Sequence, residues 1–315
     1  MSLERALELA ERGRGGTHPN PIVGCVLMRG DCVVGEAWHE QAGEAHAEVL
    51  ALRQAGERAR GATAYVTMEP CNHHGRTPPC TDALIEAGVA AVLAGARDPN
   101  PKAGGGLEQL LAAGVTVAVE DGELAFRCRQ QNEAWRTWIT LERPFVILKL
   151  ALTFDGRVAR PDRRWVTGET SRRRVHEFRA QVDAVAVGMG TVLADDPQLT
   201  VRDAVAAKQP RRLAFGRPPL PKDSDLELRT GVPEDELRAL AGDGVQSLLV
   251  EGGPRLAAEL LRADLVDKVL LFMAPAFAGA GRAFTPELGL PIDLEHLTVE
   301  RVGEDVLLTA YVHSP

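Results

Sequence analysis

The sequence is poor in aromatic side chains, has few cysteines and contains no long apolar run. Phe, Trp and Tyr make up 4% of its 315 residues, so the core must be built from Ala, Val and Leu. Lys and Arg number 36 against 44 Asp and Glu, and the net charge of −8 argues against a nucleic-acid partner, which selects basic surfaces. No run approaches roughly 18 apolar residues, so we expect no membrane span.

The five cysteines are an odd number in a long chain, which is not typical of a disulfide framework. We therefore expect a cytoplasmic protein whose cysteines are buried side chains, metal ligands or reactive thiols. The first residues are amphipathic and acidic rather than signal-peptide-like. Cys25, Cys32 and Cys128 lie in apolar strand or helix patterns and are predicted to be small buried side chains.

Length and composition predict two α/β domains, because 315 residues with 45% hydrophobic content can bury two cores. The first half alternates helices and strands after a hairpin, which predicts helices on both faces of one sheet. A helix is predicted over 123–140, and Pro144 follows it. We place the domains at 1–142 and 143–315. In the second half, 190–200 is predicted to be irregular and 266–274 to be an interior strand.

One histidine and two cysteines form a metal-ligand pattern. His46 lies at a predicted helix start, Cys71 follows a short strand, and Cys80 comes after a gap of eight residues. These are ligand types that Zn²⁺ prefers, and three protein ligands leave a fourth position for water, as in catalytic sites. Glu48 can then carry a proton from that water to a leaving amine. The pattern predicts a zinc-dependent deaminase.

Two other functions fit parts of this pattern. A purely structural zinc site would need a fourth protein ligand, which His73 or His74 would have to supply. A deaminase of nucleic-acid bases would share the zinc chemistry, but it requires a basic groove and aromatic side chains around a flipped base. The net charge and the aromatic content both disfavour that second function.

Four stretches in the first half are distinctive. They are THPNPIVGC at 17–25, GEAHAE at 43–48, TMEPCNHHGRTPPC at 67–80 and DPNP at 98–101. Together they resemble the bifunctional deaminase/reductases of riboflavin biosynthesis, which share the long insertion between the cysteines. The likeness covers nearly the whole chain. It implies a cytidine-deaminase-like three-layer α/β/α domain followed by a dihydrofolate-reductase-like α/β domain.

The resemblance implies the substrate and residues of the first site. The substrate would be 2,5-diamino-6-(5-phosphoribosylamino)pyrimidin-4-one, whose C2 amine is replaced by oxygen as ammonia leaves. Glu48 would be the proton carrier beside Zn²⁺. The implied substrate-binding residues are Asn20, His39, His73, Arg76, Asp98 and Asn100. Of the two adjacent histidines, His73 rather than His74 is predicted to act.

The second half lacks a Gly-x-Gly-x-x-Gly after a strand, so the Rossmann fingerprint is absent. EGGP at 251–254 predicts instead a strand, a glycine turn and a helix start, whose free N–H groups suit a phosphate. The same turn is common in α/β folds without a nucleotide. Lys149 and Glu251 are charged residues in or beside apolar strands, which marks them as site candidates because burying an unpaired charge is costly.

The stretches KLALTFDGR at 149–157 and TVLADDPQLTVR at 191–202 extend the resemblance to the reductase of the same family. It implies that NADPH reduces the ribosyl group of 5-amino-6-(5-phosphoribosylamino)uracil to ribityl, with Lys149 as a catalytic residue. The implied cofactor-binding residues are Ala151, Trp165, Thr167, Thr191, Asp195, Gly253, Pro254 and Arg255. The implied substrate-binding residues are Arg163, Arg179, Leu199, Arg202 and Glu251. A homo-oligomer is a further expectation from the family.

Three departures from the family pattern lie in the second half. Gly216 stands where the family usually has Asp, the loop between Val158 and Trp165 is shorter, and residues 203–245 lack a strand–helix piece. An alternative function follows from these departures. In that alternative the chain is only a deaminase, and its degenerate reductase half binds or regulates.

Overall fold

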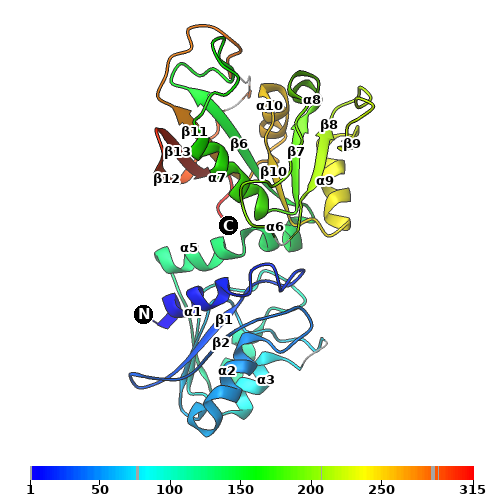
Figure 1. Cartoon of the computed structure of the whole chain (residues 1–315). Helices are drawn as coiled ribbons and strands as arrows, with labels where there is room; N and C mark the ends of the chain where they lie inside the picture. Colours follow the sequence, from blue (N-terminus) through cyan, green and yellow to red (C-terminus); the bar gives the residue numbers. More distant parts are fainter. Residues whose placement is uncertain (1, 76–77, 207, 285–287, 290) are drawn as a thin grey trace. The chain divides into compact units, whose positions relative to one another are not determined.

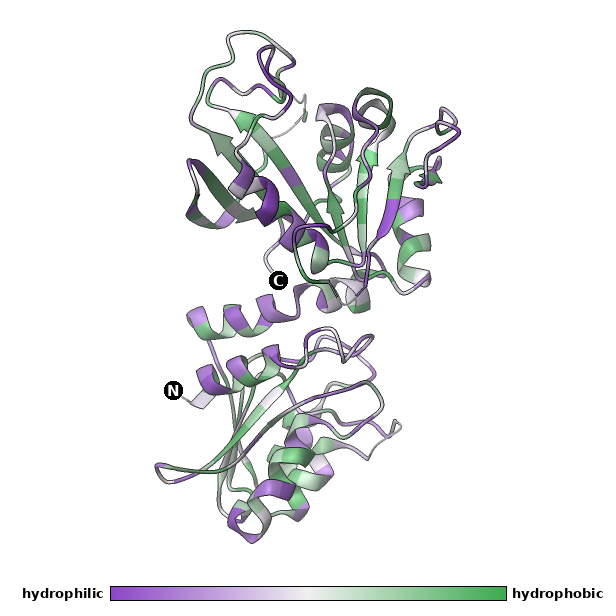
Figure 2. Cartoon of the chain, viewed as in Figure 1, coloured by the Kyte–Doolittle hydropathy of each residue, from purple (hydrophilic) through white to green (hydrophobic). Residues whose placement is uncertain are grey.

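The structure is a computed structural model that describes residues 2–75, 78–206, 208–284, 288–289 and 291–315 (Figure 1). The chain divides into two compact units at the junction of Leu141 and Glu142. Figure 2 shows apolar residues along the strands of both units and polar residues on the outer faces of the helices. Across the described ranges, no helix is both long and apolar enough to cross a bilayer.

The first unit is built on a five-stranded sheet in the order β2-β1-β3-β4-β5. Its strands are β1 (Gly24–Arg29), β2 (Cys32–Trp38), β3 (Thr63–Val66), β4 (Ala91–Ala94) and β5 (Thr116–Val119). Strand β1 is antiparallel to β2 and β3, whereas β3, β4 and β5 are parallel. The carboxyl ends of the three parallel strands therefore lie at one edge, where ligands of open α/β sheets bind.

Helices cover both faces of this sheet, which confirms the predicted three-layer arrangement. One apolar cluster includes residues of α1 and α5, and another includes residues of α2, α3 and α4. The helices are α1 (Ser2–Glu11), α2 (Ala47–Ala55), a 3₁₀ turn η1 (Gly56–Ala59), α3 (Cys80–Glu86), α4 (Gly106–Ala112) and α5 (Gly122–Gln131). A Cβ atom on Gly35 would lie 2.3 Å from the Ala51 carbonyl oxygen. This glycine therefore lets α2, which carries Glu48, lie close against β2.

The single helix predicted over 123–140 is wrong, because the chain breaks at Asn132 between α5 and α6 (Glu133–Leu141). Asn132 has φ −118° and ψ 24°, outside the helical region. Its buried side chain accepts a hydrogen bond from the Ile22 N–H at 2.9 Å and donates one to the Ile22 carbonyl at 2.8 Å. This pairing with a distant loop is the physical reason for the break, and it fixes the start of α6.

The second unit is built on an eight-stranded sheet in the order β12-β13-β11-β6-β10-β7-β8-β9. Its strands are β6 (Phe145–Thr153), β7 (Ala184–Gly188), β8 (Arg211–Phe215), β9 (Glu227–Arg229), β10 (Ser247–Val250), β11 (Lys268–Ala274), β12 (Glu295–Val302) and β13 (Asp305–Tyr311). From β11 to β9 the strands are parallel, and β13 and β12 alternate in direction. Strand β11 lies between β13 and β6, so the predicted interior strand is confirmed.

Helices lie on both faces of the second sheet as well. Residues of α9 and α10 join one apolar cluster, and residues of α7 and α8 join another. These helices are α7 (Glu169–Ala180), α8 (Met189–Asp195), α9 (Pro233–Gly242) and α10 (Pro254–Arg262). The irregular stretch predicted at 190–200 is wrong over its first half, because α8 lies there. Glycines at 188 and 190 hide the helical pattern, but Met189 and Val192 are buried on one face.

The segment 203–245, predicted to be abbreviated, holds β8, the very short β9 and α9. Gly216 follows β8 with φ +150°, and a Cβ atom there would lie 2.7 Å from Met189 Cβ. The close approach to α8 explains why glycine replaces the expected Asp. Among the cysteines, Cys25 and Cys128 are buried as predicted, but Cys32 is exposed. It begins β2 directly after a turn, at the edge of the sheet, which its apolar neighbours do not reveal.

A buried ion pair connects the start of β6 with the start of β11. The Arg143 guanidinium donates two hydrogen bonds of 2.7 Å to the Asp267 carboxylate, and Asp267 is only 1% exposed. The backbone N–H of Val146 donates to the same carboxylate at 2.7 Å. Both carboxylate oxygens of Asp267 therefore accept hydrogen bonds, as a buried charge requires.

Asp267→Asn is expected to lower the free energy of unfolding by about 3–5 kcal/mol, because it leaves the buried Arg143 cation without its counter-charge. Asp264→Asn is a matched control. Asp264 pairs with His313 at 3.0 Å on the surface, where its side chain is 75% exposed, and such pairs contribute less than about 1 kcal/mol. Urea denaturation measures the free energy of unfolding of both variants. Equal losses in the two would contradict a larger contribution from the buried pair.

Candidate active sites

Three metal-binding side chains meet at one edge of the first sheet. His46 precedes the first residue of α2, Cys71 lies after β3, and Cys80 begins α3. His46 Nδ1 lies 3.2 Å from Cys80 Sγ and 3.5 Å from Cys71 Sγ. Tetrahedral bonds to Zn²⁺ separate nitrogen and sulfur ligands by roughly 3.6 Å. The three residues therefore fit a zinc ion with one coordination position left open.

The electrostatics of the cluster favour thiolate. Hydrogen bonds from Cys80 and His46 lower the pKa of the Cys71 thiol to about 4. The contact with Cys71, together with burial, raises the pKa of Cys80. Hydrogen bonding therefore stabilises the Cys71 thiolate, and a bound metal ion would deprotonate both thiols.

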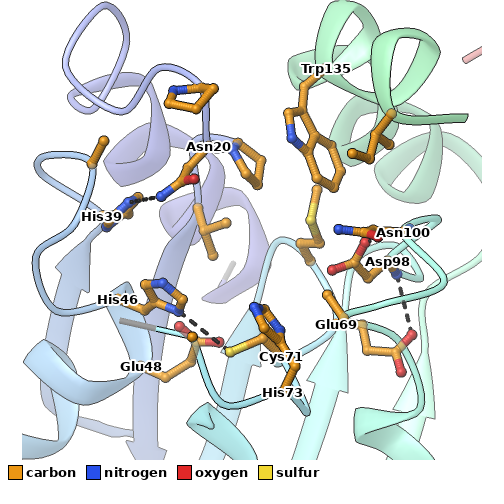
Figure 3. Close-up of a pocket in the computed structure, with 18 of the residues that line it drawn as sticks. Asn20, His39, His46, Glu48, Glu69, Cys71, His73, Asp98, Asn100 and Trp135 are labelled. Atoms are coloured by element: carbon orange, nitrogen blue, oxygen red, sulfur yellow. Dashed lines mark hydrogen bonds between the residues drawn. The ribbon is translucent and has the colours of Figure 1, made fainter. Parts of the chain in front are cut away.

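Glu48 lies beside the cluster but outside the three-ligand set. It is the second residue of α2 and only 3% exposed, and burial raises its pKa to about 7. A carboxyl group with such a pKa can take up and release a proton near neutral pH. Figure 3 shows it next to His46 and Cys71.

A cavity of about 460 Å³ opens from this cluster, within the range of small-molecule sites. It brings together most of the residues that the sequence predicted. Its lining includes Asn20, His39, His46, Glu48, Cys71, His73, Asp98 and Asn100. Exposed His74 is not among the lining residues, and Arg76 lies outside the described residues.

Hydrogen bonds fix the orientation of His39 and Asn20. His39 Nδ1 donates to the Ala45 carbonyl at 3.3 Å, and its Nε2 accepts from the Asn20 amide nitrogen at 3.3 Å. Burial lowers the pKa of His39, so the ring is neutral at pH 7. With its nitrogen on His39, Asn20 can offer its side-chain oxygen to a ligand in the cavity (Figure 3).

Glu69 is a site residue that the sequence did not reveal. It is 4% exposed and accepts hydrogen bonds of 3.2 Å from the backbone N–H groups of Asp98 and Leu107. It thereby ties the Asp98 loop and the start of α4 to the segment that carries Cys71. Burial raises the pKa of Asp98 to about 6. One signal in the sequence could have identified Glu69, namely its position as an acidic residue directly after an apolar strand.

Glu69→Gln is expected to raise KM for the substrate of the predicted deaminase about tenfold with a smaller change in kcat, because an amide N–H would face a backbone N–H and shift the Asp98 loop. Steady-state ammonia release measures the KM and kcat effects. Glu108→Gln is the control, since Glu108 pairs with Arg97 on the surface, where both side chains are exposed. Loss of bound zinc in Glu69→Gln would contradict an effect limited to the Asp98 loop.

In the second unit, three predicted residues form one charged cluster. Lys149 of β6 lies beside Glu251, which follows β10, with Nζ and Oε2 3.6 Å apart. Arg179 of α7 donates to both Glu251 oxygens at 2.5 and 3.1 Å, and to the Thr200 carbonyl at 3.0 Å. Burial opposes ionisation of Glu251, but the two cations outweigh it and lower its pKa. The carboxylate is therefore charged and holds both cations.

The start of α10 fits a phosphate group. Gly253 precedes Pro254, the first residue of this helix, and offers no side-chain cap, so backbone N–H groups there are available to an anion. A Cβ atom on Gly253 would lie 3.4 Å from Thr191 Oγ1, which places α8 beside this turn. The predicted cofactor residues Thr191, Gly253 and Pro254 are therefore together.

The remaining predicted residues are more scattered. Exposed Trp165 is flanked by Arg164 and Arg172, whose guanidinium carbons lie 4.9 and 5.3 Å from its ring. Leu199 has φ +55° and a buried side chain, so only its backbone can meet a ligand. Ala151 is part of β6, and the carbonyl of Thr167 accepts a hydrogen bond from Arg172. Arg163, Asp195, Arg202 and Arg255 are exposed.

Two family models match the chain. Residues 2–96 match the cytidine and deoxycytidylate deaminase zinc-binding region, and residues 144–308 match the RibD C-terminal domain. The riboflavin biosynthesis protein RibD of Aquifex aeolicus is 39% identical over 352 aligned positions, covering 97% of this chain and 96% of the relative. That of Escherichia coli is 39% identical over 358 positions, covering 97% of each. Both alignments exceed 315 positions, so these relatives carry residues that this chain lacks.

Two solved structures are similar to this chain over nearly its whole length. RibD of Acinetobacter baumannii has a TM-score of 0.84 at 34% identity, covering 98% of this chain and 97% of that one. A diaminohydroxyphosphoribosylaminopyrimidine deaminase/5-amino-6-(5-phosphoribosylamino)uracil reductase of Thermotoga maritima has a TM-score of 0.83 at 34% identity and the same coverage. The predicted fold classes, a cytidine-deaminase-like domain followed by a dihydrofolate-reductase-like domain, are confirmed.

Proposed function

The chain belongs to the RibD family of riboflavin biosynthesis, and we propose from this that its two sites perform consecutive steps on one phosphoribosylated pyrimidine. It is a zinc-dependent deaminase and an NADPH-dependent reductase. The observation that carries the first activity is the His46, Cys71 and Cys80 cluster beside buried Glu48. The alternative of a degenerate reductase half is not favoured, since the RibD C-terminal match spans 144–308.

In the first step, water replaces the C2 amine of 2,5-diamino-6-(5-phosphoribosylamino)pyrimidin-4-one. His46, Cys71 and Cys80 would hold Zn²⁺, which when bound would supply an activated water at neutral pH. Asn20 and neutral His39 orient the pyrimidine, and Glu48 takes the water proton and delivers it to the departing nitrogen, which leaves as ammonia. Asp98, Asn100, His73 and Arg76 bind the phosphoribosyl side.

In the second step, the ribosyl group of the deaminated product becomes ribityl. NADPH, when bound, would supply the hydride that C1′ of the opened, imine-like sugar accepts. Lys149, held by Glu251, gives a proton to the ring oxygen as the sugar opens. Arg179 and Arg202 support the phosphate side of the substrate. The α10 start, Thr191 and Trp165 bind the nucleotide.

The test is a coupled assay of the zinc-loaded chain with the diaminopyrimidine substrate and NADPH. Ammonia release and loss of NADPH absorbance are followed together, and both are expected in equal amounts. Ammonia without NADPH loss would reinstate the degenerate-reductase alternative, and no ammonia would reject the deaminase assignment.

Location and assembly are part of the same proposal. The protein would act in the cytoplasm, as a homo-oligomer, on small substrates, with neither nucleic acid nor a membrane as partner. Its net charge of −8 supports the exclusion of nucleic acid. Sedimentation of the purified chain measures its oligomeric state.

A further inference from the structure

One wall of the deaminase cavity comes from α6, the last helix of the first unit. Trp135, Trp138 and Ile139 line this cavity. Their spacing of i, i+3 and i+4 places them on one helical face. Figure 3 shows the Trp135 indole on the side of Asp98 and Asn100, away from His46 and Glu48. The cavity therefore has a metal end and an aromatic end.

The residues at the aromatic end lie outside the zinc-binding region that cytidine and deoxycytidylate deaminases share. The match to the zinc-binding region of deaminases ends at residue 96, and the RibD C-terminal match begins at residue 144. Asp98, Asn100 and the whole of α6 fall between these limits. The metal end can thus serve the chemistry common to such deaminases, whereas this intervening segment shapes the part of the cavity that distinguishes one substrate from another.

Asn132 fixes the position of α6, which forms the aromatic end, relative to the loop that carries Asn20. Its side-chain amide pairs with both backbone groups of Ile22, two residues after Asn20. The same two hydrogen bonds therefore set the loop that carries Asn20 and the first turn of α6, where Trp135 lies. Trp135 is only 7% exposed, so its ring is held by packing as well. An immobilised ring costs little further entropy when a ligand binds.

We propose that Trp135 is a sugar platform, a specificity-determining residue whose indole face packs on the ribose of the deaminase substrate. This inference rests on the proposed function. The pyrimidine C2 must reach the metal end, so the group at the aromatic end is the phosphoribosyl moiety. Ribose combines C–H groups with hydroxyls, and an aromatic face beside a carboxylate and an amide matches both. Asp98 and Asn100 supply the polar partners.

The experiment compares Trp135→Leu and Trp135→Phe with the wild type, using KM and kcat for ammonia release and inhibition by ribose 5-phosphate. Trp135→Leu is expected to raise both KM and the inhibition constant of ribose 5-phosphate about tenfold, with kcat changed less than about threefold. Trp135→Phe retains a ring and is expected to keep both constants within about threefold of wild type. Phe126→Leu, in neighbouring α5 and also buried, is the matched control for lost packing.

Ammonia release by the wild-type protein is measured first, because its absence would reject the proposed function itself. With an active wild type, four results would overturn the sugar platform. The first three are failure of ribose 5-phosphate to compete, an unchanged KM in Trp135→Leu, and equal effects in Phe126→Leu. A loss confined to kcat would also overturn it, since that would place Trp135 at the reacting end of the cavity.

Discussion

Replacing Glu48 by glutamine is expected to reduce deamination by about 10²–10⁴-fold, the usual contribution of a general acid–base group. The amide keeps the size of the side chain but cannot take a proton from the water or pass it to the leaving nitrogen. Zinc should remain bound, because His46, Cys71 and Cys80 are unchanged. Ammonia release measures the loss, and a zinc assay of the purified variant measures the metal.

Two comparisons make this prediction specific. The variant should still oxidise NADPH when given the deaminated uracil product, because Lys149 and Glu251 belong to the second unit. Glu44→Gln is the matched control, since exposed Glu44 lines the same cavity. It should retain activity within about threefold, as expected for a group that transfers no proton. A similar loss in both variants would mean that negative charge, rather than proton transfer at Glu48, limits the reaction.

Replacing Lys149 by methionine is expected to produce the opposite phenotype, with NADPH oxidation reduced by about 10²–10³-fold and ammonia release unchanged. Methionine keeps the aliphatic length of the side chain in β6 but removes the ammonium. Glu251 remains paired with Arg179 through two hydrogen bonds, so no buried carboxylate is left without a counter-charge. The second unit should therefore stay folded.

Lys268→Met is the control for this second prediction. Lys268 belongs to the neighbouring strand β11, and its ammonium lies 4.8 Å from the Tyr311 ring. Thermal unfolding of both variants tests whether the sheet is intact, and initial rates with supplied uracil product test the reductase. If Lys149→Met abolished both activities in a folded protein, the assignment of separate sites would be wrong.

The zinc cluster could be predicted from the sequence because its signals are local. His46 and Glu48 lie two residues apart, and Cys71 follows an apolar strand, so residue type and spacing suffice. Glu69 and Asn132 were not predicted, because their partners are distant in the chain. Glu69 binds backbone groups 29 and 38 residues away, and Asn132 pairs with a residue 110 positions earlier.

The fold shows the same division between local and distant information. Most strands and helices follow the apolar periodicity, but β9 has three residues, too few to establish a period of two. Helix α8 was missed because Gly188 and Gly190 suggest a loop, whereas tertiary burial of Met189 and Val192 stabilises the helix. The individual roles assigned to the reductase residues remain predictions.

The position of α6 late in the first unit also determines the order in which the first site is completed during translation. All three metal ligands precede residue 81, whereas the wall formed by α6 ends at Leu141. At about 5–20 residues per second, a ribosome adds this wall several seconds after the last zinc ligand. A nascent chain can therefore hold its metal ligands before it has a complete substrate cavity.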